Sequence, residues 1–149
     1  MAFELVLDAS VSLAWVIRER DASRAAYAEA IARLAAGDTV LHVPIHWGIE
    51  MGHVLRRELN AGTLRRRAIQ RAFDDLDQID IRSHTEHYSA REVFELAGRY
   101  NLQGYDALYF ELARALKLPL ATLDHGHIQA ARQQHDVTRF VPGVAESTK

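Results

Sequence analysis

Short apolar runs alternate with longer stretches of helical periodicity along this chain of 149 residues. The apolar runs have the length of buried strands, and most of them end at a proline or an aspartate. Strands are predicted over five segments: residues 3–7, 39–43, 79–82, 119–123 and 137–141. The third and the last are the shorter or weaker signals, so the count of strands is about five.

Between these runs, apolar residues recur with the spacing of one helix face. Helices are predicted over seven segments: residues 10–18, 21–36, 45–59, 64–76, 86–100, 105–116 and from 125 to about 134. Ser10 and Asp21 are candidate N-caps, and the turns at Gly37 and Gly62 are typical helix ends. Strands that alternate with helices predict an α/β fold, in which a parallel sheet of about five strands lies between two helical layers.

Nothing in the sequence divides the chain into separate domains. It contains no internal repeat, no low-complexity tract and no linker, and its length is that of one ordinary domain. We expect a single domain over residues 1–145 and a short tail at residues 146–149.

Composition indicates the setting of the protein more than its activity. Hydrophobic residues make up 48% of the chain, which is enough to build one core. The absence of cysteine excludes disulfides and thiolate metal sites, and it suits a reducing cytosol. The N-terminus lacks the positive charge of a secretory signal, and no apolar stretch is long enough to cross a bilayer. We therefore expect a soluble, cytoplasmic protein without a membrane partner. The net charge of −2 neither requires nor excludes a nucleic-acid ligand.

Four acids have positions that suit metal chemistry. Asp8 and Asp124 each follow a predicted strand, and in neighbouring strands ~4.8 Å apart their carboxylates could reach one ion. Glu50 lies among largely apolar neighbours in its predicted helix, and Asp106 lies in the first turn of another. Each acid also has a structural interpretation, because aspartates cap helices, acids complement the helix dipole and helical glutamates face solvent. Carboxylate oxygens are the ligands that Mg²⁺ and Mn²⁺ prefer.

Around these acids the chain resembles the PIN-domain family, specifically the VapC-like ribonuclease toxins of type II toxin–antitoxin systems. Four blocks carry the resemblance, in family order and with family-like spacing: Leu5-Val6-Leu7-Asp8-Ala9-Ser10-Val11, then Val43-Pro44 followed by Glu50 and Val54-Leu55-Arg56-Arg57, then Tyr105-Asp106-Ala107-Leu108-Tyr109, and finally Leu120-Ala121-Thr122-Leu123-Asp124. The blocks span nearly the whole chain, so the resemblance implies one PIN-like domain with three α/β/α layers.

The resemblance also implies an endoribonuclease that cleaves single-stranded RNA with Mg²⁺ or Mn²⁺. It implies that four acids bind the metal and are catalytic, namely Asp8, Glu50, Asp106 and Asp124. Ser10 and Thr122 are expected to line the same pocket. A metal-bound water would attack the RNA phosphate, and the identity of any general base stays open. A toxic role, a cognate antitoxin protein and a homodimer are implied in the same way.

The histidines introduce an alternative metal site. The chain has His53 where relatives commonly have asparagine, and we expect this side chain to line the pocket. His46, Glu50 and His53 are spaced for one helix face, so a softer ion such as Zn²⁺ is the alternative, although the HExxH spacing of zinc proteases is absent. His125 and His127, which follow the fourth predicted strand, are candidates for RNA contacts or for positions around the metal ligands.

Arginines gather where two predicted helices meet. Arg56 and Arg57 lie in the first of these helices, and the run Arg65-Arg66-Arg67 lies at the start of the second. They are candidates for contacts with RNA phosphates or a partner protein, and a solvated helix face is the alternative. The tryptophans and tyrosines are expected in the core or in interfaces rather than as stacking platforms for bases.

Two other functions fit parts of the pattern. A receiver-like phosphoacceptor domain also holds Mg²⁺ in an acidic pocket, but it usually has a lysine nearby, and the only lysines here are Lys117 and Lys149. A catalytically silent RNA- or protein-binding module on the same fold is the other alternative. Four clustered carboxylates without a use disfavour it, because they repel one another.

Overall fold

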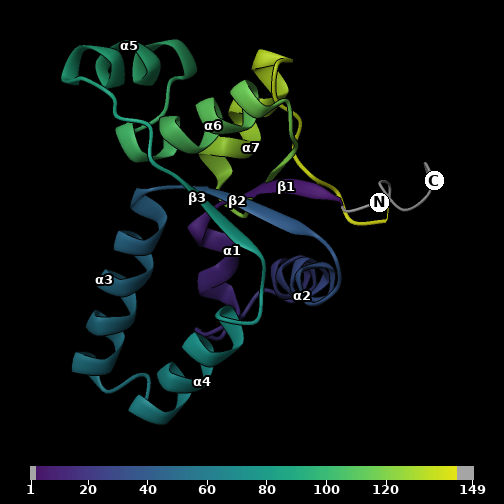
Figure 1. The fold of residues 1–149 in the computed structure, drawn as a ribbon, viewed down its shortest axis with the longest axis vertical. Coiled ribbons are helices and arrows are strands. Elements are labelled where there is room, and N and C mark those ends of the chain that lie inside the picture. Colours follow the sequence, from purple (N-terminus) through teal and green to yellow (C-terminus); the bar gives the residue numbers. More distant parts are fainter. Residues whose placement is uncertain (1–2, 144–149) are drawn as a thin grey trace.

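A computed structural model of the protein describes residues 3–143. Its centre is a four-stranded parallel sheet in the order β3-β2-β1-β4 (Figure 1). The strands are β1 (Glu4–Leu7), β2 (Val40–Pro44), β3 (Ile81–His84) and β4 (Leu120–Ala121). Strand β1 therefore lies between β2 and β4, and the carboxyl ends of β1 and β4 meet at the same end of the sheet.

Helices cover both faces of this sheet. They are α1 (Ala9–Ala14), α2 (Ala22–Ala36), α3 (His46–Ala61), α4 (Arg66–Leu76), α5 (Ala90–Tyr100), α6 (Gly104–Leu116) and α7 (His125–Gln134). In Figure 1, α1 to α4 lie below the sheet and α5 to α7 above it, so the predicted three-layer α/β fold is confirmed. Among residues 3–143, no helix combines the length and the apolar character needed to cross a membrane.

Strand β1 contributes to the core on both of its faces. Leu5 and Leu7 pack with Ile31 of α2 in one buried cluster, whereas Val6 packs with Phe110 of α6 in the other. All five side chains have no exposed surface. Full burial of such side chains stabilises the fold by roughly 1.5–3 kcal/mol each. The strand that leads to Asp8 is therefore held firmly from both faces.

The sheet has four strands where about five were expected. Residues 137–141 form one isolated bridge, between Leu120 and Arg139, instead of a strand. Two backbone hydrogen bonds support it: Leu120 donates to the Thr138 carbonyl at 2.9 Å, and Phe140 donates to the Leu120 carbonyl at 2.8 Å. Because β4 is only two residues long, residues 137–141 can form no more than this short pairing with it. The tail expected at residues 146–149 lies outside the described residues.

Two element boundaries next to the acids differ from the predictions. Strand β4 ends at Ala121 rather than at residue 123, so Asp124 follows the strand by three residues and is the N-cap of α7. Helix α1 begins at Ala9, and the residue at its N-cap position is Asp8 rather than Ser10. Both aspartates therefore lie at junctions between a strand and a helix, where a side chain can point away from the sheet.

Candidate metal-binding site

Asp8 lies at the buried end of the candidate site. Only 4% of the residue is exposed, and its Oδ2 accepts hydrogen bonds from Ser10 Oγ at 2.6 Å and Thr122 Oγ1 at 2.8 Å. Burial opposes ionisation, yet the hydrogen bond and charge of His127, together with the two hydroxyls, hold the pKa of Asp8 below its ordinary value. An ionised carboxylate is thus held at the carboxyl end of β1.

Hydroxyl groups connect the ends of β1 and β4. Thr122 Oγ1, which donates to Asp8, also accepts a hydrogen bond from the backbone nitrogen of Asp124 at 3.0 Å. Ser10 Oγ likewise accepts one from the backbone nitrogen of Leu123 at 3.0 Å. The structure therefore places Ser10 and Thr122, the two residues expected to line the pocket, directly against Asp8.

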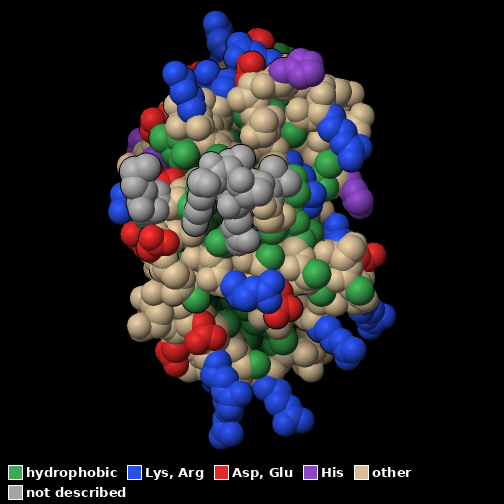
Figure 2. All heavy atoms as spheres, turned by 90° about the vertical axis from the view of Figure 1, so that its right-hand side faces the viewer, with side chains coloured by type: hydrophobic (Ala, Val, Ile, Leu, Met, Phe, Trp, Pro, Cys, Tyr) green, Lys and Arg blue, Asp and Glu red, His purple; other side chains and the backbone are tan. Residues whose placement is uncertain are grey.

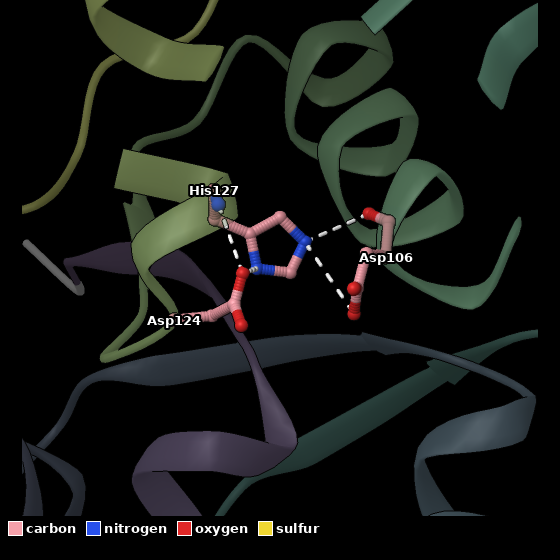
Figure 3. A group of neighbouring side chains, drawn as sticks. All are labelled: Asp106, Asp124 and His127. Carbon is pink, nitrogen blue, oxygen red and sulfur yellow. Dashed lines mark hydrogen bonds and ion pairs between the residues drawn. The ribbon is translucent and has the colours of Figure 1, made fainter. Parts of the chain in front are cut away.

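His127 occupies the middle of the acids. Its ring lies between Asp106 and Asp124 (Figure 3). Nε2 donates to the backbone carbonyl of Asp106 at 2.8 Å, while Nδ1 lies 3.4 Å from Asp8 Oδ2 and 3.6 Å from Asp124 Oδ2. A carbonyl oxygen only accepts, so Nε2 carries a proton, and the two carboxylates favour a second proton on Nδ1.

The charge of His127 offsets that of its neighbours. Burial by itself would lower the pKa of this histidine, but the hydrogen bond and charge of Asp8, followed by the contacts with Asp106, raise the pKa of His127 to about 9. The side chain has no exposed surface. Two roles were predicted for His127: contact with RNA, or a position around the metal ligands. Contact with RNA requires exposed surface, so the buried side chain fits only the second role.

Asp106 and Asp124 form the exposed side of the cluster. Their side chains are 32% and 40% exposed, respectively. Asp124 Oδ2 accepts from the backbone nitrogen of His127 at 2.9 Å, so Asp124 does cap α7, as its structural interpretation proposed. Burial raises the pKa of Asp106, and the charges of Asp124 and Asp8 act in the same direction. Capping and metal binding are compatible for Asp124, because the cap engages only one carboxylate oxygen.

Glu50 approaches the cluster from the second turn of α3. The hydroxyl of Tyr109, a buried residue of α6, donates to Glu50 Oε1 at 2.9 Å, and His46 Nε2 lies 3.3 Å from the same oxygen. Burial raises the pKa of Glu50 to about 7, and the charges of Asp8 and Asp106 contribute to that rise. Glu50 therefore shares the electrostatic environment of the three aspartates.

The donor atoms of the cluster fit a hard divalent cation. Among the described residues, one group has ligand atoms that all lie within 4.8 Å of one another, and it consists of Asp106, Asp124 and His127. Asp8 adjoins this group through His127. Nε2 of His127 is engaged by the Asp106 carbonyl, and the carboxylate oxygens of the cluster are ligands that suit Mg²⁺ or Mn²⁺. Burial and the charges of Asp124 and Asp8 raise the pKa of Asp106 although the charge of His127 lowers it, so a cation would be stabilised beside this carboxylate.

The histidine alternative for the metal does not come together in the described residues. His46 is buried beside Glu50, but His53 is exposed and belongs to no group of converging ligand atoms. His53 therefore does not line the carboxylate cluster directly. His125 is exposed at the first position of α7, where it is free to contact a ligand outside the cluster.

The predicted arginines lie beyond Glu50 along α3 and at the start of α4. Arg56 and Arg57 are exposed on the second half of that helix, and the run 65–67 is exposed at the start of α4. From Glu50 to Ala61 the helix advances by roughly 16 Å. Figure 1 shows the turn between α3 and α4 at the end of the molecule remote from the sheet, and Figure 2 shows basic side chains projecting at that lower end.

Gly126 makes room for the Asp124 carboxylate. A Cβ at this position would lie 2.9 Å from Asp124 Oδ2 and 3.4 Å from Leu102 Cδ2. Because the backbone nitrogen of His127 holds Oδ2, relief of the clash would turn the carboxylate. We expect Gly126→Ala to weaken Mn²⁺ binding roughly 10- to 100-fold by calorimetry. Gly98→Ala, at an open helical position, is the matched control, and equal affinities for both variants would remove Asp124 from the ligand set.

Comparisons with known proteins agree with the resemblance seen in the sequence. A profile of the PIN domain matches residues 5–133. The chain is 31% identical over 134 residues to ribonuclease VapC3 from two strains of Mycobacterium tuberculosis, and the match covers 90% of this chain and 92% of that protein. The crystal structure of PAE2754 from Pyrobaculum aerophilum is similar with a TM-score of 0.61 and 24% identity, over 87% of each chain. The latter likeness concerns the fold alone.

Proposed function

The chain belongs to the PIN-domain family, and from this membership we propose that it is a metal-dependent endoribonuclease that cleaves single-stranded RNA. The observation that carries the proposal is the convergence of Asp8, Asp106 and Asp124 around His127 at the carboxyl ends of β1 and β4. The similarity to ribonuclease VapC3 supports RNA as the substrate. Membership in this family also leaves no place for the receiver-like alternative.

The acids would divide the work according to their exposure. Asp106 and Asp124, the more exposed pair, would hold the ion together with Asp8 and Glu50. Both hydroxyl hydrogen bonds to Asp8 reach Oδ2, which leaves Oδ1 for the ion. A bound Mg²⁺ or Mn²⁺ supplies a water of lowered pKa and compensates charge on the phosphate. His127 positions the start of α6 through the Asp106 carbonyl.

Cleavage is expected to depend on Mg²⁺ or Mn²⁺. Protein stripped with a chelator should leave a short single-stranded RNA intact and should recover its activity when either ion is added, because carboxylate ligands prefer hard cations. Gel analysis of a 5′-labelled RNA measures this, and the same sequence in a duplex should be resistant.

Two results of that assay would contradict the proposal. Rescue by Zn²⁺ alone, abolished by His53→Asn, would favour the histidine site on α3. Binding of the RNA without cleavage under every metal would favour the catalytically silent module.

We further propose that the protein acts in the cytoplasm as the toxin of a toxin–antitoxin pair and forms a homodimer. The VapC relatives support the toxin role. Co-expression of the cognate antitoxin should suppress growth arrest.

The homodimer has a separate test. Exposed apolar side chains on the described surface, Ile49 and Val141 among them, are compatible with a surface that another chain covers. Light scattering should give twice the monomer mass.

The arginines at the start of α4 are expected to bind RNA phosphates at a distance from the cut. Arg66 and Arg67 occupy the first turn of α4, where the helix dipole disfavours positive charge. Their charges therefore do not stabilise the helix, which leaves binding of a ligand as their role. Replacement of Arg65, Arg66 and Arg67 by alanine should reduce the salt slope of RNA affinity by about 2, at ~0.7 per lost phosphate contact. Arg33→Ala, on the exposed face of α2, is the control. An unchanged slope would return the run to an ordinary solvated surface.

A further inference from the structure

Tyr105 is an exposed aromatic side chain next to the acids. It occupies the second position of α6, directly before Asp106, and 62% of it is exposed. Tyr109, one turn later in the same helix, has no exposed surface. Tyrosines were expected in the core or in interfaces, and Tyr109 meets that expectation, whereas Tyr105 lies on the surface. Single exposed apolar residues are common, so exposure alone does not mark a site.

A buried histidine supports one face of the Tyr105 ring. The rings of Tyr105 and His46 are stacked, with centroids 4.9 Å apart and planes inclined by 22°. His46 is 4% exposed. Its ring meets the Tyr109 ring edge to face, with centroids 4.8 Å apart and planes inclined by 78°. The Tyr105 ring is therefore backed by packed side chains on one face, and its exposed surface is available to a ligand.

The stacked rings lie against the candidate catalytic acids. His46 Nε2 is 3.3 Å from Glu50 Oε1, and Tyr109 donates its hydroxyl to that same oxygen at 2.9 Å. Two exposed apolar side chains mark the start of α3: Ile45 is its N-cap residue, and Ile49 lies in its first turn. Tyr105 thus stacks on a histidine that also contacts Glu50, while the neighbouring carboxylates would engage a phosphate through the metal.

We propose that the exposed face of Tyr105 stacks on an unpaired base of the RNA, beside the phosphate that is cleaved; this inference rests on the ribonuclease function proposed above. Every base has a π-face that can stack on tyrosine, and bases of single-stranded RNA are free to turn toward a protein. In a duplex both faces of a base are covered by its neighbours. The platform therefore favours single-stranded substrates, tolerates any base and binds best those that stack most strongly.

The first test replaces the ring. We expect Tyr105→Ala to lower kcat/KM for a short single-stranded RNA by about 5- to 150-fold, the usual effect of losing one base–aromatic stack. Tyr105→Phe should retain nearly full activity, because it keeps the stacking surface. Phe94→Ala is the matched control, since Phe94 is an aromatic of α5 that is 74% exposed. Thermal melting of all the variants should match that of the wild type.

The second test removes the base instead of the ring. RNAs with a single abasic nucleotide, placed at each position around the cut, should include one that the wild type cleaves 5- to 150-fold more slowly. Tyr105→Ala should cleave that abasic RNA no more slowly than it cleaves the intact RNA. Loss of the ring and loss of the base remove the same contact, so the two effects should not multiply.

Each outcome bears on a distinct statement. Wild-type activity in Tyr105→Ala, or effects that multiply at every abasic position, would overturn the stacking assignment. A shift of Tyr105→Ala from dimer to monomer in light scattering, with multiplying effects, would assign Tyr105 to an interface between copies of the chain. Failure of the wild type to cleave any RNA would instead contradict the proposed ribonuclease function.

Discussion

Asp8→Asn should reduce RNA cleavage by at least about 100-fold, beyond the 10- to 100-fold that loss of a residue supporting a metal ligand typically causes. Asparagine keeps the size of the side chain and its carbonyl oxygen but removes the charge. Asp8 is the most buried of the four acids and accepts hydrogen bonds from Ser10 and Thr122. Few other groups could take its place at the end of β1, so loss of its charge should affect the metal directly.

The variant can be tested in the cell and in solution. Induction of the wild-type chain should arrest bacterial growth, whereas Asp8→Asn at the same soluble level should not. Single-turnover cleavage of a labelled RNA gives the rate. Asp38→Asn, which neutralises an exposed acid in the turn after α2, is the matched control. Growth arrest by Asp8→Asn equal to that of the wild type would remove Asp8 from the catalytic assignment.

His127→Gln should lower the free energy of unfolding of the metal-free protein by about 3–5 kcal/mol, the usual cost of removing one partner from a buried charged pair. The imidazole contacts Asp8, Asp124 and the carbonyl of Asp106, and it has no exposed surface. Glutamine can replace one of these hydrogen bonds, but it supplies no positive charge to the carboxylates.

A divalent cation should restore part of this loss. Carboxylates without the imidazolium have more to gain from Mn²⁺. A ligand that binds only the folded state stabilises it by RT ln(1 + L/Kd), where L is its free concentration, so tighter binding gives a larger gain at the same concentration. Urea denaturation with and without Mn²⁺ should therefore show a larger gain for His127→Gln than for the wild type. His125→Gln, two residues away and exposed, should change stability by no more than about 0.5 kcal/mol. Equal behaviour of the two variants would show that His127 is not the counter-charge of the site.

The strand pattern carried much of the candidate site. Asp8 and Asp124 were selected because each follows an apolar run, and parallel strands bring their carboxyl ends together; β1 and β4 are indeed paired neighbours. The length of β4 was overestimated, because Thr122 turns its hydroxyl to Asp8 and the chain leaves the sheet there. Whether these acids bind metal and catalyse cleavage stays a prediction.

One helix start shows a signal that was present in the sequence and not used. The prediction that a helix begins at residue 86 was wrong, because α5 begins at Ala90. Ser89 and Glu92 form a capping box: the serine hydroxyl accepts from the backbone of Glu92, and the glutamate accepts from the backbone of Ser89, both at 3.1 Å. Serine followed three residues later by glutamate is the local signature of such a start.

By itself, the sequence determined the alternation of strands and helices, the α/β class and the family, and it selected the four acids as candidates. The elements follow from the periodicity of apolar residues, which reflects the buried face of each helix or strand. The family and the candidate acids follow from short motifs. Only the tertiary structure decided that His127 lies among the acids and that His46 supports Tyr105. Such contacts join segments 21 to 119 residues apart, so they depend on strand register and helix packing that no local pattern of residues specifies.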